Sequence, residues 1–146
     1  MPPQDDAPTL TGQAEDYLKT IFDLERSGQP AGTNDIAARL GIAPASVTGM
    51  VQRLARLGLV ETTRYRGTRL TDAGRHAALQ LIRRHRIIES YLVERLGFSP
   101  DDVHDEAERL EHAASDDLIE RMAAAIGNPT EDPHGTPIPA PRSGTP

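Results

Sequence analysis

Two imidazoles and two carboxylates recur within one short acidic stretch of the sequence. They are His104, Glu108, Glu111 and His112. Spacings of four, three and one place these side chains on one face of a helix. Carboxylate oxygen and imidazole nitrogen are the donors that hard and borderline divalent cations take in proteins. Three such side chains can ligate one ion, with water or another helix completing its coordination.

A second pair of donors, His85 and Glu89, lies upstream with a spacing of four residues. This spacing again places both side chains on one helical face, so the sequence carries donors for two metal sites between packed helices. Each piece alone has an ordinary explanation, because charged and imidazole side chains mostly face solvent or serve the structure. The combination favours metal binding, since three of the five histidines lie in these two groups.

The helices that must position these donors are predicted from apolar residues at helical spacing and from flanking glycines and prolines. They cover about residues 11–25, 34–40, 44–57, 72–96, 99–113 and 115–126. Ser99 and Pro100 are expected to begin the helix that carries His104. From Asn128 onward the chain holds six of its twelve prolines, which indicates a linker or tail.

The second and third predicted helices are joined by a tight turn at Gly41, which is the layout of a helix-turn-helix. Residues 59–71 then predict a β-hairpin that turns at Arg66 and Gly67. A hairpin in this place is the wing of a winged helix. The second helix of the pair is expected to enter the major groove of DNA with its first residues against base edges.

The candidate DNA contacts stand opposite the apolar face of that helix or on the hairpin. They are Ala45, Ser46, Thr48, Gly49, Gln52, Arg53, Arg56, Arg64, Arg66 and Arg69. Ser46 and Thr48 can hydrogen-bond to bases or phosphates, and Gln52 can read adenine. The arginines suit phosphates. Arginines alone often form a solvated face, but here they coincide with a helix-turn-helix followed by a hairpin, which favours DNA binding.

Charge is distributed unevenly along the 146 residues. Residues 33–90 hold ten basic and four acidic side chains, whereas residues 91–146 hold four basic and twelve acidic ones. A basic middle suits the phosphates of DNA, and an acidic helical segment suits a divalent cation. The net charge of −6 for the whole chain therefore does not exclude a DNA-binding protein.

The composition excludes several other chemistries. The chain has no cysteine, which excludes disulfides, thiolate zinc sites and a cysteine nucleophile. No apolar run approaches the roughly 18 residues that a membrane span needs. Residues 1–9 lack the basic start and the apolar stretch of a signal peptide, so the expected location is the cytoplasm, without a membrane partner.

Five segments resemble the diphtheria-toxin-repressor family of iron- and manganese-dependent regulators. They are AEDYLKTI (14–21), SVTGMV (46–51), YRG (65–67), RHR (84–86) and VHDEAERLEH (103–112). The resemblance runs from about Gly12 to Pro139, and the metal motif behind a winged helix is specific. It implies a homodimer in which each subunit pairs an N-terminal winged helix with a helical metal-binding and dimerisation domain.

The resemblance also implies the metal ligands by position. The primary site would use Asp16, Glu108, Glu111 and His112, and an ancillary site would use His85, Glu89 and His104. Iron-type members carry Met and Cys where this chain has Asp16 and Glu108. Oxygen in place of sulfur favours the harder Mn²⁺, with Fe²⁺ as the alternative, at one or two ions per subunit. Manganese-type members often have a Glu where this chain has Lys19, and this departure favours the separated ancillary site over two closely spaced ions.

The sequence and the resemblance together predict a mainly α-helical fold: an N-terminal winged helix-turn-helix, then an α-helical metal-binding and dimerisation domain. The expected boundaries are a disordered N-terminus (1–10), a DNA-binding domain (11–75), the helical domain (76–127) and a proline-rich tail or linker (128–146). Ile88, Leu92, Leu118 and Met122 are expected either on the dimer surface or in the core. Larger family members continue into a small β-barrel after such a linker, and a two-domain or a shortened form both stay open.

The expected function is a transcriptional repressor that needs Mn²⁺ or Fe²⁺ to bind a double-stranded DNA operator and that controls metal homeostasis through uptake genes. An ion that joins Asp16 in the first domain to ligands in the second would set the separation of the two recognition helices. A metal-independent winged-helix regulator is an alternative, but it leaves the His/Glu face without a purpose. A helical metalloenzyme is a second alternative, but it needs ligands such as Glu-x-x-His from two helices. No catalytic residues are expected.

Overall fold

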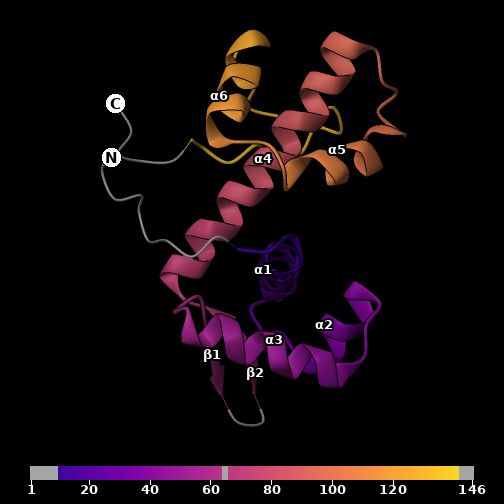
Figure 1. Ribbon diagram of the computed structural model, residues 1–146. Helices are drawn as coiled ribbons and strands as arrows, with labels where there is room; N and C mark the ends of the chain where they lie inside the picture. Colours follow the sequence, from indigo (N-terminus) through magenta and orange to yellow (C-terminus); the bar gives the residue numbers. More distant parts are fainter. Residues whose placement is uncertain (1–9, 64–65, 142–146) are drawn as a thin grey trace.

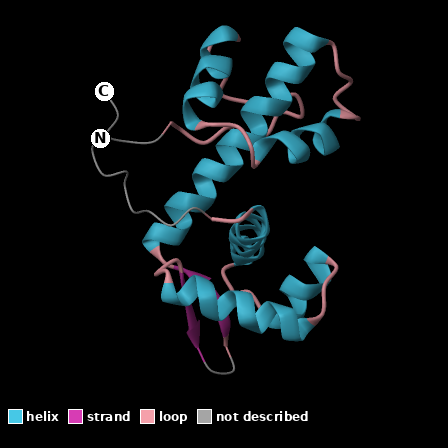
Figure 2. Cartoon of the chain, viewed as in Figure 1, coloured by secondary structure: helices cyan, strands magenta, loops and turns pink. Residues whose placement is uncertain are grey.

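Helices form most of the chain, and the structure, a computed structural model, describes residues 10–63 and 66–141 (Figures 1 and 2). The elements are α1 (Gly12–Leu24), a 3-10 turn η1 (Glu25–Ser27), α2 (Thr33–Leu40), α3 (Pro44–Arg56), β1 (Val60–Thr63), β2 (Gly67–Leu70), α4 (Asp72–Leu96), α5 (Val103–Glu111) and α6 (Asp116–Ala125). The predicted fold class is confirmed: a helix-turn-helix and a hairpin come first, and helices follow.

Hydroxyl side chains cap three of the helices at their first turn. Thr11 accepts a hydrogen bond from the backbone of Ala14, and Thr71 accepts one from Gly74. Ser115 does the same at the start of α6. Each cap satisfies a backbone N–H group that the helix leaves without a partner, which fixes where the helix begins.

The helix expected to begin at Ser99 begins instead at Val103. The backbone N–H of Asp102 donates to the carbonyl of Ser99 at 3.0 Å and closes a separate turn. The Ser99 hydroxyl accepts from Asp101 within this turn, so it is not a helix cap. Local side-chain bonding of this kind competes with helix formation.

The hairpin is antiparallel, with Val60 opposite Leu70 and Thr63 opposite Gly67. Ala31 extends this small sheet, because its backbone exchanges two hydrogen bonds of 2.8 Å with Thr68. Gly67 has a φ of +92°, and a Cβ there would lie 2.6 Å from the carbonyl oxygen of Ala31. Only glycine fits this turn without strain, so the hairpin is held against the segment before α2.

The described residues form two hydrophobic cores, and α4 contributes to both. The first core packs α1, α2, α3 and the hairpin around Tyr17, Leu18 and Ile36. The second packs the later half of α4 against α5 and α6. Ala78 and Leu81 of α4 lie in the first core. Figure 1 shows α4 running from the hairpin to the helices of the second core.

Two residues that were expected either on a dimer surface or in the core lie in the second core. Ile88 and Leu92 are both buried there. Met122 packs against the same core, whereas the side chain of Leu118 on α6 is half exposed. Among the described helices, none has the length and apolar character needed to cross a membrane.

The proline-rich segment after α6, which the sequence suggests is a linker or tail, packs against α4 in its described part. Ile138 contacts the second core. Arg83 donates to the carbonyl of Pro139 at 3.0 Å, and Arg86 donates to that of Pro137. Arg83 also holds Glu120 of α6 through two hydrogen bonds. These contacts between distant parts of the chain hold a segment that has no regular secondary structure of its own.

Candidate metal centre

The four residues expected in the primary site lie together where α1 meets α5. Asp16 comes from α1, Glu108 and Glu111 come from α5, and His112 follows α5 directly. Each offers one donor atom, and these atoms lie within 4.8 Å of one another. The Nε2 atom of His112 is 3.3 Å from an Asp16 oxygen and 3.5 Å from a Glu111 oxygen. We call these four residues the α1–α5 cluster.

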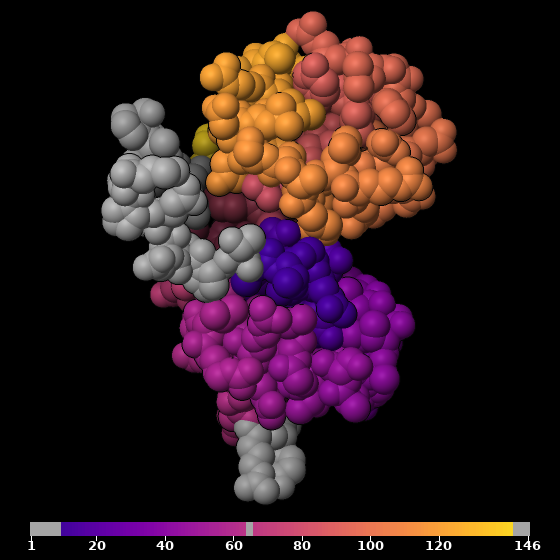
Figure 3. Space-filling model, in the orientation of Figure 1, coloured from indigo at the N-terminus to yellow at the C-terminus, as the bar shows by residue number. Residues whose placement is uncertain are grey.

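In Figure 3 the indigo atoms of α1 lie directly below the orange atoms of the later helices. The position of α1 explains how Asp16 reaches α5, although 92 residues separate Asp16 from Glu108. The first core buries Ala14, Tyr17, Leu18 and Ile21 on one face of α1. Asp16 lies off that apolar face and is half-buried.

Two of the three expected ancillary residues, His85 and His104, share a donor group with Glu108 of the first cluster, whereas Glu89 belongs to a different group. His85, His104 and Glu108 each place a donor within 4.8 Å of the others. The Nε2 atom of His85 is 3.1 Å from Nδ1 of His104 and 2.7 Å from an oxygen of Glu89. His85 therefore contacts both of its expected partners, and Glu108 lies close enough to join them.

A third group contains two residues that sequence reasoning missed. Glu89, Asp132 and His134 place donor atoms within 4.8 Å of one another. Glu89 is 3% exposed, and its Oε2 atom accepts no hydrogen bond from the described residues. That oxygen lies 3.8 Å from Nδ1 of His134. The signal in the sequence is an Asp-x-His motif, which the prolines around it obscured.

Asp132 is fixed by the turn that carries it. Its Oδ1 atom accepts hydrogen bonds from the backbone N–H groups of His134 at 2.9 Å and Thr136 at 2.8 Å. Nε2 of His134 lies 2.9 Å from the carbonyl of Pro100. The proline-rich segment thus presents these two side chains to Glu89 on α4.

Two cationic side chains lie among the carboxylates of the α1–α5 cluster. The ammonium of Lys19 donates to Oε1 of Glu111 and lies 3.5 Å from Glu108. Burial alone would lower the pKa of Lys19, but its hydrogen bond to Glu111 and the charges of Glu111, Glu108 and Asp16 raise that pKa overall. Burial raises the pKa of Asp16, although His112 and Lys19 act in the opposite direction.

His85 is the second cation. Nδ1 of its ring lies 2.6 Å from Oε2 of Glu111, and Nε2 faces Glu89. Burial alone would lower the pKa of His85, but hydrogen bonds to Glu111 and Glu89 and their charges raise it to about 9. Burial alone would raise the pKa of Glu111, but hydrogen bonds from His85 and Lys19 lower it overall. Both oxygens of Glu111 therefore face a positive charge.

Glu15 orients the imidazole of His112. Nδ1 of His112 is 2.9 Å from Oε1 of Glu15, so that Nε2 faces Asp16 and Glu111. Arg84 of α4 lies 4.0 Å from Glu15 and donates to the backbone carbonyl of Glu111. Partners of this kind fix the ring orientation and tautomer that a histidine offers to a metal.

The donor set fits a hard or borderline divalent cation. Three carboxylates and one imidazole converge in the α1–α5 cluster, and the described residues supply no sulfur donor there. A second observation comes from the third group, where the Oε2 atom of Glu89 is buried and accepts no hydrogen bond from the described residues. Such an oxygen is costly unless a cation or water faces it, so this group also fits a cation.

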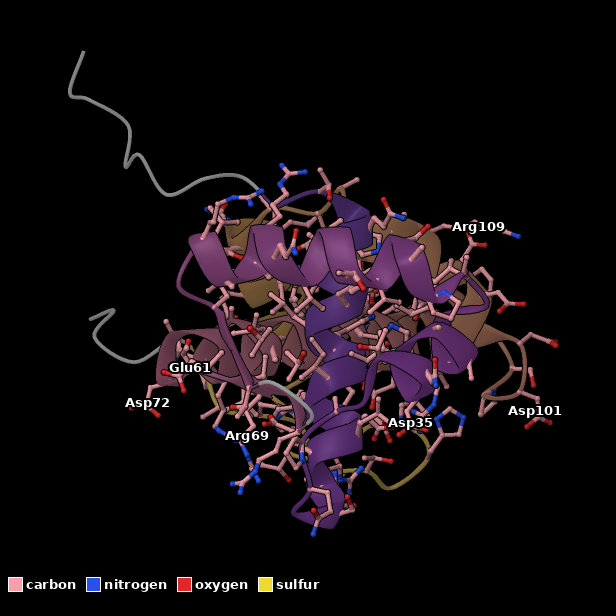
Figure 4. The ribbon with its side chains drawn as sticks, turned by 90° about the horizontal axis from the view of Figure 1, so that it is seen from below. Asp35, Glu61, Arg69, Asp72, Asp101 and Arg109 are labelled. Carbon is pink, nitrogen blue, oxygen red and sulfur yellow. The ribbon has the colours of Figure 1, made fainter. Side chains whose placement is uncertain are left out.

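The candidate DNA contacts that the structure describes lie on α3 and at the hairpin. The nine that the structure describes are exposed: Ala45, Ser46, Thr48, Gly49, Gln52, Arg53, Arg56, Arg66 and Arg69. Arg64 lies outside the described residues. A groove of about 490 Å³ runs between the start of α2, α3 and the hairpin, with Thr48, Gln52 and Arg66 in its lining. In Figure 4, Arg69 lies on the same edge as Glu61 and Asp72, and Asp101 and Arg109 lie on the opposite edge.

Two family descriptions match nearly the whole chain. Residues 9–68 match the iron-dependent repressor N-terminal DNA-binding domain, and residues 71–140 match the iron-dependent repressor metal-binding and dimerisation domain. The chain belongs to the iron-dependent repressor family. This membership confirms the resemblance seen in the sequence, and both descriptions are of repressor domains rather than of an enzyme.

Members of the iron-dependent repressor family with known names and structures are similar over most of this chain. The iron-dependent repressor IdeR of Mycobacterium tuberculosis is 39% identical over 130 residues, which is 89% of this chain and 56% of IdeR. The diphtheria toxin repressor of Corynebacterium diphtheriae is 36% identical over 130 residues, 89% of this chain and 58% of that protein. This chain therefore spans little more than half the length of these two relatives.

Two solved structures extend the comparison. A manganese-dependent transcriptional repressor in complex with manganese has a TM-score of 0.81 and 44% identity, covering 91% of this chain and 62% of that one. IdeR of T. acidophilum has a TM-score of 0.76 and 32% identity, with 90% and 62% covered. The fold is therefore shared with repressors named for manganese and with repressors named for iron.

Proposed function

We propose that the chain is a dimeric repressor that binds DNA when a divalent metal ion occupies the α1–α5 cluster, and that it regulates genes of metal uptake. The observation that carries the proposal is that the cluster spans two units. Asp16 comes from the helix that packs against the DNA-reading elements, whereas Glu108, Glu111 and His112 belong to the later helices. A bound ion supplies a positive charge shared by all four side chains.

The chain's own residues explain why such a contact controls DNA binding. Asp16, Glu108 and Glu111 carry three like charges within a few ångströms, and the single ammonium of Lys19 offsets them only in part, so a divalent ion between them favours the approach of α1 to α5 further. The position of α1 fixes that of α3, because both pack in the first core. In a dimer, the distance between the two copies of α3 has to match the spacing of half-sites in DNA.

A second copy of the chain has a surface available on α5 and α6. Leu110 on α5 is 40% exposed and Leu118 on α6 is 47% exposed, and neither belongs to the second core. These exposed leucines leave apolar area on both helices that a second copy can cover. This surface supports the homodimer, for which the family description of residues 71–140 already names a dimerisation domain.

Oxygen-rich donors support Mn²⁺ as the signal, with Fe²⁺ as the alternative. The α1–α5 cluster is proposed as the primary site, with His85, Glu89 and His104 as the residues of a second site. Asp132 and His134 add to the donors that face Glu89. We therefore propose one or two ions per subunit, in a protein that acts in the cytoplasm.

The test is DNA binding by fluorescence anisotropy at fixed salt, with Mn²⁺, Fe²⁺, Zn²⁺ or a chelator. The DNA is a fragment from upstream of a manganese-transporter gene. We expect binding with Mn²⁺ that the chelator abolishes, and we expect Asp16→Ala to lose this metal response while it keeps its fold. Asp23→Ala is the matched control, because Asp23 lies on the same helix and pairs with Arg39. Equal binding with and without metal would refute the proposal.

A further inference from the structure

The chain has a single lysine, and that lysine lies in the α1–α5 cluster. Lys19 comes from α1, and the other fifteen strongly basic residues are all arginines. Its ammonium donates to Oε1 of Glu111 and is 3.5 Å from Oε1 of Glu108. The side chain is 18% exposed. The lysine therefore contacts two of the carboxylates to which the proposed function assigns the metal.

Lys19 uses the oxygen of Glu111 that faces the other donors of the cluster. Oε1 of Glu111 lies 3.5 Å from Nε2 of His112, whereas Oε2 faces His85. An ammonium is a compact charge with three donors, so it can neutralise several carboxylates at once. It cannot contribute a lone pair to a metal ion while it is protonated. Lys19 and a metal ion therefore compete for the same oxygen.

We propose that Lys19 is a resident counter-ion of the α1–α5 cluster, which holds α1 against α5 in the metal-free protein and leaves Glu111 when metal binds. This inference rests on the proposed function, because it assigns the same cluster to a metal ion. The competition sets the metal concentration at which the protein responds. A divalent ion that binds has to displace the ammonium of Lys19 from Glu111. The affinity of the cluster for the metal ion is therefore lower than the carboxylates alone would give.

The exchange also explains how the metal-free protein tolerates its carboxylates. Glu111 is 2% exposed, and a buried carboxylate without a partner is strongly unfavourable. Lys19 reaches it from α1, the same helix that supplies Asp16. The ion pair thus joins the same two helices that the proposed metal joins, but with one positive charge in place of two.

The first experiment follows the single lysine by NMR in the full chain. With lysine as the only ¹⁵N-labelled residue, the side chain gives one ammonium signal, visible when a hydrogen bond slows its proton exchange. Cd²⁺ is the probe, because it is diamagnetic. We expect the protected signal in the metal-free protein and its loss by fast exchange at saturating Cd²⁺. A protected signal that stays unchanged at saturation would overturn the inference.

Calorimetry on the same samples separates the two proposals. If the protein shows no heat of binding with Cd²⁺ or Mn²⁺ and does not compete with a chelator for these ions, the proposed function fails together with the inference. If metal binds with the lysine signal unchanged, the inference alone fails. Neither readout depends on DNA.

The second experiment removes the charge. Lys19→Met removes the charge and keeps an unbranched side chain one atom shorter, whereas Lys19→Arg keeps the charge. Arg75→Met is the control, because Arg75 pairs with Glu25 outside the cluster. We expect Lys19→Met to bind Mn²⁺ at least about tenfold more tightly, which corresponds to about 1.4 kcal/mol. Its metal-free form should melt several degrees lower. Lys19→Arg and Arg75→Met should keep the affinity of the unmodified chain.

Equal or weaker Mn²⁺ binding by Lys19→Met would overturn the competition. If Lys19→Met does not fold without metal, the NMR experiment on the unmodified chain decides the question alone.

Discussion

Raising the pH should destabilise the metal-free protein through one imidazole. His85 is held between Glu111, at 2.6 Å from Nδ1, and Glu89, at 2.7 Å from Nε2. These contacts raise the pKa of His85 to about 9, from an ordinary value of 6.5. The protonated ring is therefore favoured in the folded chain, and deprotonation removes a positive charge from between two carboxylates.

The sign and size of the effect follow from linkage. Below pH 6.5 the ring is protonated in both the folded and the unfolded chain, so its stabilisation is complete. Between pH 6.5 and 9 only the folded chain keeps the proton, and the free energy of unfolding falls by about 1.4 kcal/mol per pH unit. The total loss is at most about 3.5 kcal/mol, and it is complete above pH 9.

Urea unfolding in the presence of a chelator, at pH 6.5, 8 and 9.5, measures this loss. His85→Gln is the control, because its amide can still bond to a glutamate but does not titrate in this range. We expect the free energy of unfolding of the unmodified chain to fall more steeply with pH than that of the variant. Identical pH dependence in the two proteins would refute the assignment of the raised pKa to His85.

Three substitutions test other parts of the fold. Gly74→Ala would place a Cβ 1.9 Å from the carbonyl oxygen of Leu59, so we expect a loss of about 1–3 kcal/mol or more in thermal unfolding. Gly49→Ala adds a methyl group to the exposed face of α3 with nothing within 4 Å, so it should stabilise the fold by about 0.5–1 kcal/mol. The same variant should weaken DNA binding if α3 approaches the bases closely, and unchanged anisotropy titrations would exclude Gly49 from the interface. Arg83→Met breaks two hydrogen bonds to Glu120, and urea unfolding should show a loss of about 2 kcal/mol.

The α5 part of the α1–α5 cluster could be read from the sequence because its residues are neighbours on one helix. Spacing alone predicts that Glu108 and Glu111 share a face. Asp16 could not be found in this way, because its approach to α5 depends on how the two cores pack around α4. Asp16 was predicted as a ligand from the family resemblance, because relatives with the same fold bring this position of the first helix to the same place.

The prolines after Asn128 concealed Asp132 and His134. Prolines and the absence of an apolar period indicate a segment without regular structure, and that part of the interpretation agrees with the elements found. The composition of this segment does not reveal that two arginines of α4 donate hydrogen bonds to the carbonyls of Pro137 and Pro139. Contacts between distant residues place an irregular segment as firmly as a helix, and they leave no periodic signal in the sequence.

The sharing of α4 between the two cores has a mechanical consequence. A helix of 25 residues is about 37 Å long, and it joins the cores without a loop between them. A flexible joint would absorb a small change at one end, but a continuous helix acts as a lever. A tilt of about 5° displaces the far end of such a rod by about 3 Å, roughly the rise of one base pair along DNA. In the function proposed above, ångström adjustments among the carboxylates are thereby converted into a fit or a misfit on DNA.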